Sequence, residues 1–363
     1  MRPLIVDLGR DYRGGQHQAL LLLQGLRERG HAPELIAVRN STLAARAAEM
    51  GAPVYPVGPA RRRMNAAWLI RRFVRGGRFD LVHANEPHAL TAAWLARAHR
   101  FVPVVASRRV TLPLARSYFS LARYRAAARI IAVSEFVKQT VLQSGLAPGR
   151  VAVIFDGVQI PAEISESERD AARTQFGISP EARVAGYIAA FVPQKRHAFL
   201  LEAFATLISQ LPASVLLLRG EGPELSRLQA RARELQIVES VKFLTPDVPI
   251  DAAFAAMDVF AFPAMGEALG TALLAAMAHA LPVAAIDSGG VSEVVASGKN
   301  GVTLKNPDAG AFGQAIAQLL SQPDDATRLG MSGRETVIAN FSADRMVDGT
   351  LSLYGQLTQT STG

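Results

Sequence analysis

Short apolar runs alternate with longer amphipathic stretches over the first 160 residues. Apolar runs of about four to eight residues predict buried strands, and a stretch such as 16–29 predicts a helix. Strands that alternate with helices are typical of a parallel sheet covered by helices on both faces. The pattern predicts strands over residues 4–8, 34–38, 81–84, 104–106, 130–133 and 151–154.

The same alternation begins again after a polar, acidic stretch at residues 163–168, which we interpret as a linker. Further strands are predicted near residues 184–188, 215–219, 241–244, 259–262 and 282–286. No repeat of about 20–50 residues is present, so a solenoid is excluded. We therefore predict an α/β protein of two Rossmann-like, doubly wound domains, whose ligands lie at the carboxyl ends of the strands, in a cleft between the domains.

The composition is that of a globular protein, with 49% apolar and 19% charged residues in a chain of 363. The chain has no cysteine, which excludes disulfides, a thiolate nucleophile and a Cys-ligated metal. The N-terminal apolar run is too short for a signal peptide, and no run approaches the roughly 18 apolar residues that span a bilayer. We expect a cytoplasmic protein without a transmembrane anchor.

The net charge of +8 is distributed unevenly along the chain. Residues 1–160 hold 24 Lys and Arg against 9 Asp and Glu, a balance of +15, whereas the remainder holds 15 against 22, a balance of −7. Every basic residue of the first part except Lys138 is an arginine, whose guanidinium binds phosphate in a bidentate fork. The first domain is therefore predicted to have an anionic partner.

A first motif with candidate chemistry lies in the second domain. A strand ends at Phe262, and a loop that contains Glu267 leads into a helix of small residues, predicted to begin near Leu269. The first N–H groups of a helix are unpaired and lie at the positive end of its dipole, which suits a diphosphate. Gly270 would let a ligand approach the backbone. An ordinary buried helix after an exposed glutamate explains this segment equally well.

A second motif follows, in which a strand finishes in Ser288-Gly289-Gly290 and Glu293 lies one turn further on. Such a glycine turn places backbone N–H groups at the end of the sheet. From Phe262 to Asp308 the chain resembles glycosyltransferase family 4, in which a Phe-Pro strand precedes a glutamate loop and a Gly-Gly-x-x-Glu turn. The resemblance covers essentially the whole chain, with further matching segments at 14–15, 29–31, 133–136, 155–158, 192–195, 200–204, 219–224 and 341–343.

The resemblance implies the GT-B fold, in which two Rossmann-like domains face each other across a cleft and a C-terminal helix crosses back to the first domain. It implies an acceptor domain over residues 1–162 with the crossover helix 343–363, and a nucleotide-sugar donor domain over residues 163–342. The implied activity is that of a retaining glycosyltransferase. It would move a sugar from a nucleotide diphosphate to a lipid-linked or envelope-glycan acceptor, of the lipopolysaccharide or glycolipid type.

The resemblance also assigns roles to residues. Lys195 would neutralise the diphosphate leaving group, Glu267 would bind hydroxyls of the transferred sugar, and Gly15 would approach the donor phosphates from the first domain. Preorganised cations and N–H groups suit this reaction because negative charge develops on the diphosphate. The sequence has no Asp-x-Asp pair, so we expect no metal and no cofactor. The expected donor contacts are Gly14, Gly15, Arg196, Gly220, Glu221, Ala268, Leu269, Gly270, Ala275, Gly289 and Gly290.

The sequence departs from the family pattern at two places. The family has a second glutamate that contacts the nucleotide ribose, where this chain has Ala275, and losing that contact would cost about 1–3 kcal/mol. Many members have Gly-Arg before the lysine, where this chain has Ala189-Ala190. Arg196 stands where a glycine is usual and would supply the missing cation. We interpret both changes as variation within a subfamily, and an enzyme with a shifted donor or a degenerate site is the alternative.

His88 lies shortly after the predicted strand 81–84, at the expected cleft. A neutral imidazole can both donate and accept a hydrogen bond. We therefore predict that His88 contacts the acceptor or the transferred sugar, and we group it with Lys195 and Glu267 as catalytic. A structural role is the alternative.

Arginines gather on a predicted helix over residues 61–75, where a tryptophan lies among them, and again around residues 108–129, among aromatic residues. Such a surface suits an anionic lipid layer, and a solvated basic face is the alternative. Nucleic acid is disfavoured because no motif of that kind is present. We predict a protein that is peripheral on the inner face of the cytoplasmic membrane. The expected acceptor and membrane residues are Arg61, Arg62, Arg63, Trp68, Arg72, Arg75, Arg108 and Arg109.

Other classes of protein stay open. A GT-B sugar-nucleotide epimerase would need several acid and base side chains around the sugar, and in the sequence only Glu267 is a clear candidate. A phosphorylase with pyridoxal phosphate is usually longer. A nucleotide-binding scaffold without turnover is compatible with Ala190 and Ala275. A nicotinamide dehydrogenase is disfavoured because the glycines at 9, 14 and 15 do not form Gly-x-Gly-x-x-Gly.

Overall fold

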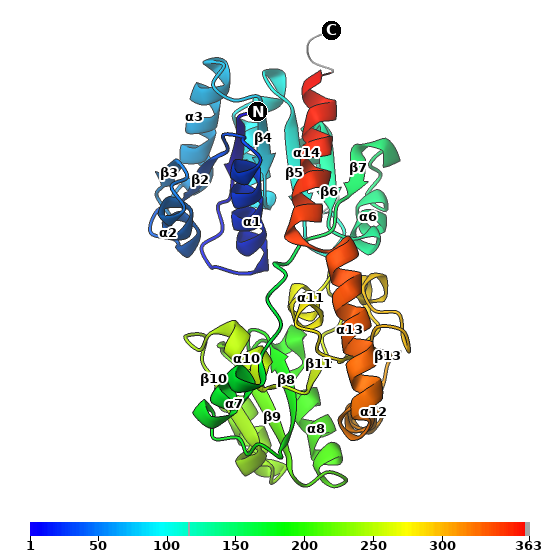
Figure 1. Cartoon of the computed structure of the whole chain (residues 1–363). Coiled ribbons are helices and arrows are strands. Elements are labelled where there is room, and N and C mark those ends of the chain that lie inside the picture. Colours follow the sequence, from blue (N-terminus) through cyan, green and yellow to red (C-terminus); the bar gives the residue numbers. More distant parts are fainter. Residues whose placement is uncertain (115–116, 360–363) are drawn as a thin grey trace. The chain divides into compact units, whose positions relative to one another are not determined.

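The computed structural model describes residues 1–114 and 117–359 (Figure 1). The chain forms two compact units. The first comprises Met1–Gly157 with the segment from Phe341 onward, and the second comprises Val158–Asn340. The last helix, α14 (Ala343–Gln359), therefore belongs to the first unit, and residues 360–363, which were expected to continue it, lie outside the described residues.

The acidic stretch at residues 163–168 is not a simple linker. The change of unit falls between Gly157 and Val158, rather than after residue 162. Ser165 caps helix α7 (Glu166–Gln175): its hydroxyl accepts from the N–H of Glu168 at 3.3 Å, and the Glu168 carboxylate accepts from the N–H of Ser165 at 2.8 Å. Because carboxylates stabilise the positive end of a helix, this acidic run begins a helix of the second unit.

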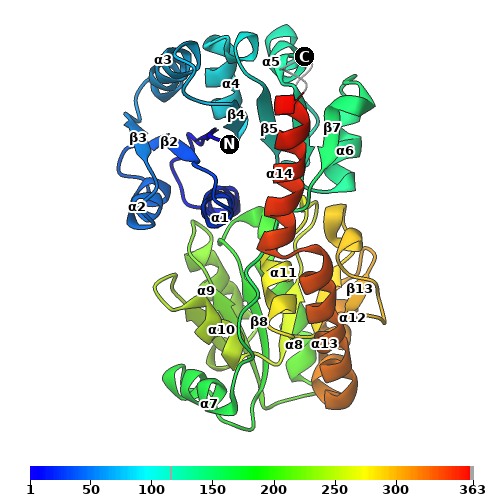
Figure 2. The same cartoon turned by 45° about the horizontal axis from the view of Figure 1, so that its top comes forward.

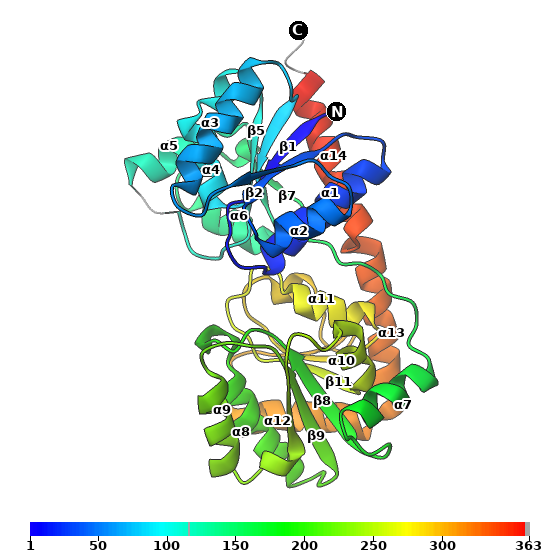
Figure 3. The ribbon, with the colours of Figure 1, turned by 90° about the vertical axis from the view of Figure 1, so that its left-hand side faces the viewer.

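The first unit contains a seven-stranded parallel sheet in the order β3-β2-β1-β4-β5-β6-β7. Helices α1, α2 and α14 cover one face, and α3, α4 and α5 lie side by side on the other (Figures 2 and 3). The strands are β1 (Pro3–Val6), β2 (Glu34–Val38), β3 (Val54–Val57), β4 (Leu81–Ala84), β5 (Val104–Arg108), β6 (Arg129–Ala132) and β7 (Val151–Val153), and the helices are α1 (Gly14–Glu28), α2 (Thr42–Glu49), α3 (Arg62–Arg75), α4 (Pro87–Leu95), α5 (Tyr118–Ala126) and α6 (Glu135–Leu142).

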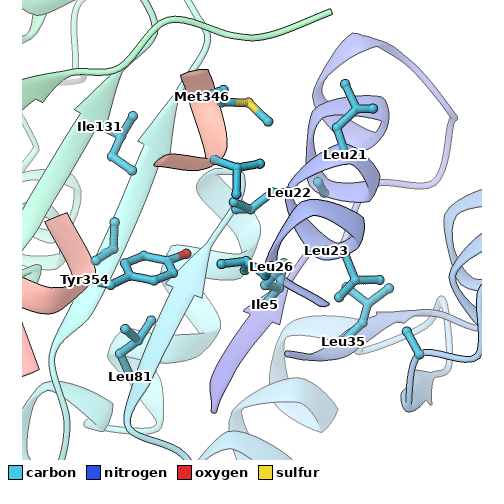
Figure 4. Packing of buried hydrophobic residues seen from close by; sticks show 14 of the residues in the cluster. Ile5, Leu21, Leu22, Leu23, Leu26, Leu35, Leu81, Ile131, Met346 and Tyr354 are labelled. Carbon is cyan, nitrogen blue, oxygen red and sulfur yellow. The ribbon is translucent and has the colours of Figure 1, made fainter. Parts of the chain in front are cut away.

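Helix α14 completes the core of the first unit. Its Met346 and Tyr354 lie among Leu22 and Leu26 of α1 and residues of the central strands (Figure 4). The two helices cross closely at Gly25, where a Cβ atom would lie 2.6 Å from Val347 Cγ2. Burial of this apolar surface stabilises the unit, which explains why the C-terminal segment returns to it.

The second unit contains a six-stranded parallel sheet in the order β10-β9-β8-β11-β12-β13. Helix α8 packs against α9 and α12, and α11 packs against α13. The strands are β8 (Arg183–Ile188), β9 (Ser214–Arg219), β10 (Val241–Leu244), β11 (Val259–Phe262), β12 (Val283–Ile286) and β13 (Val302–Leu304), and the helices are α8 (His197–Ile208), α9 (Leu225–Glu234), α10 (Ile250–Ala256), α11 (Thr271–Ala278), α12 (Ala309–Ser321) and α13 (Pro323–Asn340).

Both sheets confirm the predicted α/β class with two Rossmann-like domains. In each sheet the strand order reverses at one point, between β1 and β4 in the first unit and between β8 and β11 in the second. Doubly wound proteins bind ligands outside the carboxyl ends of the strands at such a reversal. These two strand pairs therefore define where candidate site residues are to be sought.

Candidate active site

Lys195 and Glu267 form an ion pair at the strand reversal of the second unit. Lys195 ends the short 3-10 turn η3 (Pro193–Lys195) that follows β8, and Glu267 lies in the loop between β11 and α11. The Lys195 ammonium donates to Glu267 Oε1, and the two side chains are 28% and 20% exposed. Residues 72 positions apart meet here because β8 and β11 are neighbouring parallel strands with their carboxyl ends at one edge.

The Gly289-Gly290 turn supports the backbone of the glutamate loop. The N–H of Gly290 donates to the carbonyl of Glu267 at 2.9 Å, and the N–H of Gly266 donates to Ser288 Oγ at 2.9 Å. A Cβ atom on Gly289 would lie 2.2 Å from the Glu267 oxygen, and one on Gly290 would lie 2.2 Å from the Ala268 oxygen. These close approaches explain both glycines, since any side chain would push the loop away from the turn.

Helix α11 begins beside Glu267 without a side-chain cap from any described residue. Gly270 precedes it with φ of +91°, a left-handed conformation that favours glycine. A Cβ atom there would also lie 3.1 Å from Phe262 Cζ. The helix therefore starts at Thr271, two residues later than expected, and its first N–H groups are available to an anion. Leu269 is buried, so its side chain packs into the unit.

Gly220 and Glu221 hold the loop that leads to Lys195 through their backbone. The N–H of Phe191 donates to the carbonyl of Glu221 at 2.8 Å, whereas the Glu221 side chain is exposed. A Cβ atom on Gly220 would lie 2.0 Å from the Ala189 oxygen. The structure thus gives these two residues a role in positioning the Lys195 loop, and donor contact stays a prediction.

The two departures from the family pattern lie in the same unit. Arg196 follows Lys195 in a left-handed conformation, with φ of 55°, which fits the glycine that is usual there. Its guanidinium stacks on the Phe199 ring, 4.0 Å from the centroid, so it is turned along α8 in this structure. Ala275 is half-buried on α11, and its carbonyl accepts from His279 Nδ1 at 2.8 Å.

A polar network occupies the strand reversal of the first unit. Asp7, fully buried after β1, accepts from Gln16 Nε2 at 3.1 Å and from Asn85 Nδ2 at 2.7 Å. Asn85 follows β4 and also donates to the carbonyl of Gly15 at 2.9 Å. The network therefore fixes the Gly14-Gly15 start of α1 against the sheet. We did not predict Asp7 or Asn85, although polar residues directly after adjacent strands are a signal for such a site.

Arg109 extends this network as a buried ion pair. Its Nε donates to Asp156 Oδ1 at 2.8 Å, and its Nη1 donates to Asn85 Oδ1 at 2.8 Å. The Arg109 and Asp156 side chains are 16% and 6% exposed. Arg109 Cδ would lie 3.9 Å from a Cβ atom on Gly15. The guanidinium is thus held next to the Gly14-Gly15 segment.

Arg108 and Arg109 do not join the predicted membrane surface, which corrects that prediction. Arg108 is 7% exposed, and its guanidinium donates to the carbonyl of Leu112 at 2.5 Å and to the Tyr124 hydroxyl at 3.3 Å. Arg109 neutralises Asp156, and Arg108 donates its hydrogen bonds inside the unit, so neither guanidinium is available to lipid. Arg116, which falls within the predicted arginine cluster at residues 108–129, lies outside the described residues.

His88 lies near the start of α4 and is exposed. Glu86 caps this helix: its carboxylate accepts from the N–H groups of His88 at 2.5 Å and Ala89 at 2.6 Å. Burial raises the pKa of Glu86 to about 7. Burial also lowers the pKa of His88, and the nearby charges of Arg62, Arg63 and Arg123 lower it further. His88 therefore lies within the positive electrostatic field of arginines from α3 and α5.

The remaining arginines of 61–75 are mostly at the surface. Arg61, Arg63, Arg72 and Arg75 are exposed, whereas Arg62 is half-buried. Trp68 is 62% exposed, and Cζ of the Arg72 guanidinium lies over its ring, 5.6 Å from the centroid. We call the exposed side of α3, α4 and α5 the α3–α5 surface; its other exposed apolar residues are Met64, Leu95, Tyr118 and Phe119.

Two further features bear on the predictions. Within residues 1–114 and 117–359, no helix is both long and apolar enough to cross a membrane. Among the same described residues, no three His, Cys, Asp or Glu side chains gather as a metal ion would require.

Two Rossmann-like units, each with one reversal of strand order, are the architecture of the GT-B fold. The fold is shared with the Anabaena protein Alr3699/HepE, solved with UDP and glucose, at a TM-score of 0.85 and 21% identity over 98% of this chain and 100% of that one. It is also shared with the lipopolysaccharide outer core galactosyltransferase WaaB, at a TM-score of 0.73 and 15% identity over 98% of this chain and 100% of that one.

The sequence comparisons narrow the class to a family. Residues 12–160 match the model of Glycosyltransferase Family 4, and residues 168–336 match that of Glycosyl transferases group 1. The D-inositol 3-phosphate glycosyltransferase of Gordonia bronchialis is 30% identical over 309 residues, which are 78% of this chain and 67% of that protein. The chain belongs to glycosyltransferase family 4 and is a glycosyltransferase.

Proposed function

We propose that this enzyme transfers a sugar, with retention of configuration, from a nucleotide diphosphate donor to an anionic, lipid-linked or envelope-glycan acceptor. The observation that carries the donor assignment is the Lys195–Glu267 pair. It joins a cation to a carboxylate at the strand reversal of the second unit, beside the uncapped start of α11. A diphosphate needs the cation and the N–H groups, and sugar hydroxyls need the carboxylate.

The residues present support a reaction on one face of the sugar. As the bond from the anomeric carbon to the diphosphate breaks, Lys195 and the α11 N–H groups stabilise the negative charge on the leaving phosphate. A phosphate oxygen takes the proton from the acceptor hydroxyl as its oxygen bonds to the same carbon. Glu267 holds sugar hydroxyls in place. The crystal structure of the relative HepE with UDP and glucose supports a nucleotide-sugar donor for this chain.

The donor is tested by thermal unfolding with UDP-, GDP- and ADP-sugars. We expect the nucleotide sugars with one of these three bases to raise the unfolding temperature until the binding site is saturated. A ligand that binds only the folded state stabilises it by mass action. Free sugars serve as the control and are expected to have no effect. A chain that none of the nucleotide sugars stabilises would contradict the donor assignment.

An anionic acceptor is supported by the charges of the first unit. Between Gly51 and Ser134 the sequence has 15 arginines and only two carboxylates, Asp80 and Glu86. Arg62, Arg63 and Arg123 exert positive charge on His88 and form no ion pair with any described residue. We assign His88 and these arginines to a phosphorylated or otherwise acidic acceptor, such as a lipid-linked glycan.

We further propose that the α3–α5 surface binds anionic membranes. One variant changes four exposed arginines of this surface to serine: Arg61, Arg63, Arg72 and Arg75. Its affinity for anionic vesicles, measured by co-sedimentation at low salt, is expected to fall about 100-fold or more, since each arginine near such a surface contributes about 1 kcal/mol. Wild-type binding is expected to weaken as salt rises, because exposed charges are screened over about 8–10 Å near physiological ionic strength.

The matched control for this experiment removes the same charge elsewhere. Arg183, Arg227, Arg233 and Arg328 are exposed arginines of the second unit. Their joint replacement by serine is expected to leave vesicle binding within about twofold of the wild type, because they lie outside the α3–α5 surface. If both quadruple variants bind anionic vesicles equally, or if the wild type does not bind them, the α3–α5 surface contacts only solvent and the proposal is wrong.

The ribose pocket is tested by restoring the family carboxylate. Ala275→Glu is expected to tighten donor binding about 5- to 150-fold, because a carboxylate that accepts ribose hydroxyls is worth about 1–3 kcal/mol. Donor affinity is measured by calorimetry. Ala272→Glu, at another half-buried position of α11, is the control and is expected not to tighten binding. Unchanged or weaker binding by Ala275→Glu would mean that the pocket is built around alanine.

A nucleotide-binding scaffold is the second candidate, because Ala190 and Ala275 replace expected polar contacts. A sugar-nucleotide epimerase is the alternative enzyme, and the same assay tests it. A scaffold would bind the donor without turnover. An epimerase would change the sugar and keep the nucleotide diphosphate attached. Release of nucleoside diphosphate with label in the acceptor distinguishes the transferase from both.

A further inference from the structure

The chain passes between the two units twice, once after Gly157 and once before Phe341. Within the first unit, the ends of these two passages pack together. The Phe155 ring lies against the Phe341 ring, with centroids 4.9 Å apart. A Cβ atom on Gly157 would lie 2.6 Å from Ala343 Cα and 2.7 Å from the Ser342 oxygen. We call residues 155–157 together with 341–343 the junction.

A buried glutamine of α1 binds the junction. Gln18 is 0% exposed, although the other buried residues of α1 are alanine, glycine and leucine. Its Nε2 donates to the carbonyl of Gly157 at 2.8 Å, and the N–H of Gly157 donates to its Oε1 at 3.0 Å. An apolar side chain at position 18 would leave both backbone groups of Gly157 without these partners, which is costly for buried groups.

The same glutamine closes a ring of contacts at the strand reversal of the first unit. The ring consists of hydrogen bonds and of two short stretches of backbone, and it runs through Gln18, Gly157, Asp156, Arg109, Asn85 and Gly15. It joins the first turn of α1 to the junction. Doubly wound domains bind their ligands beside such a reversal, so the ring connects the ligand-binding edge of this unit to both chain passages.

We propose that Gln18 is a positioning residue of the transfer reaction, which holds the ligand-binding edge of the first unit and both chain passages in one fixed geometry. This rests on the proposed function, in which the second unit binds the donor and the first unit binds the acceptor. Transfer requires the acceptor hydroxyl to meet the anomeric carbon of the donor. A misplacement of about 1 Å in such an approach costs on the order of 100-fold in rate.

The proposal is tested by Gln18→Met, which nearly keeps the side-chain volume and removes both hydrogen bonds. The rate of transfer to membrane extract at saturating UDP-glucose, or at whichever UDP-, GDP- or ADP-sugar binds the wild type best, is expected to fall about 10- to 100-fold. The Kd of that nucleotide sugar, measured by calorimetry, is expected to stay within about twofold of the wild type. The reason is that Lys195, Glu267 and α11 all lie in the other unit.

This split between rate and donor affinity separates positioning from a merely structural role. A structural residue lowers the Tm and leaves the rate unchanged at temperatures where the variant is folded, which thermal unfolding establishes. The matched control is Gln24→Met, at another glutamine of α1, whose Nε2 donates to Glu28 of the same helix at 2.8 Å. It is expected to keep both the rate and the Kd. A folded Gln18→Met variant with the wild-type rate would overturn the proposal.

A second variant disturbs the junction and leaves Gln18 in place. Gly157→Ala adds a methyl group that would meet the backbone of Ser342 and Ala343. The same loss of rate with unchanged donor affinity is expected. The control is Gly355→Ala on α14, where a Cβ atom would have no heavy atom within 4 Å, and it is expected to have no effect. A Gly157→Ala variant that transfers at the wild-type rate would contradict the proposal.

Gln18→Glu provides a test that can be reversed by pH. A carboxylate cannot donate to the Gly157 carbonyl, whereas a neutral carboxylic acid has both a donor and an acceptor, as the amide has. Because burial disfavours the charged form, the rate of this variant relative to the wild type is expected to rise as the pH falls from about 8 to about 5.5. The same ratio for Gln24→Glu is expected to stay constant. A ratio for Gln18→Glu that is independent of pH would contradict the role of the hydrogen bonds.

Failure of the proposed function has a different result from failure of this inference. In the first case the wild type itself transfers no sugar from any of the nucleotide sugars. In the second case the wild type transfers sugar, and the folded Gln18 and Gly157 variants transfer it equally fast.

Discussion

Lys195→Ala is expected to lower kcat about 100-fold or more. The transition state places negative charge on the departing diphosphate, and removal of one preorganised stabiliser of such charge typically has an effect of this size. The fold should survive, because the Lys195 side chain is partly exposed and its partner Glu267 can reach solvent. Steady-state kinetics with the preferred nucleotide sugar measure the change.

Lys299→Ala is the matched control for this prediction, because Lys299 is an exposed lysine of the same unit. It is expected to retain full activity. If Lys195→Ala turned over at a rate near that of the wild type, the assignment of Lys195 to the leaving group would be wrong. Loss of activity together with loss of the folded state would instead show a structural role.

A second large effect is expected for Asp156→Ala, which should destabilise the first unit by about 3–5 kcal/mol. Asp156 is the counter-ion of Arg109, and removal of one partner from a buried ion pair leaves the other charge uncompensated. Chemical denaturation measures the loss. Asp325→Ala breaks an exposed pair with Arg328 and is expected to cost less than about 1 kcal/mol.

A double replacement separates the cost of leaving the Arg109 charge unpaired from the loss of the Arg109–Asp156 pair itself. Arg109→Met with Asp156→Leu removes both charges and is expected to recover most of the lost stability, because apolar residues often replace a buried pair at little cost. A single Asp156→Ala variant that loses less than about 1 kcal/mol would show that Arg109 finds solvent or another partner. In that case the network would not fix the Gly14-Gly15 segment.

The central strands of both sheets could be predicted from the sequence, whereas two edge strands could not. β1 and β11 are buried and wholly apolar, and β4 and β8 are buried and apolar except for His83 and Arg183, so all four give a clear signal. β3 contains Pro56, and β13 has three half-buried residues that include Thr303. Proline and short length are features of edge strands, and they weaken the pattern that identifies a strand.

The ion pair at the candidate site could be anticipated from motifs, but the buried network could not. Lys195 and Glu267 stand in recognisable loops after β8 and β11. Arg109 was assigned to the surface because its charge alone does not tell whether it is buried. Its partner Asp156 is 47 positions away, and only the sheet brings β5 and β7 to the same edge.

Transfer of labelled sugar tests the account most directly. The enzyme is incubated with the radiolabelled nucleotide sugar that stabilises it best and with membrane extract as the source of acceptor. The account predicts that label enters the acceptor in an amount equal to the nucleoside diphosphate released, and that Lys195→Ala shows little of either. Interconversion of the nucleotide sugar without release of nucleoside diphosphate, or binding of the donor without any turnover, would contradict it.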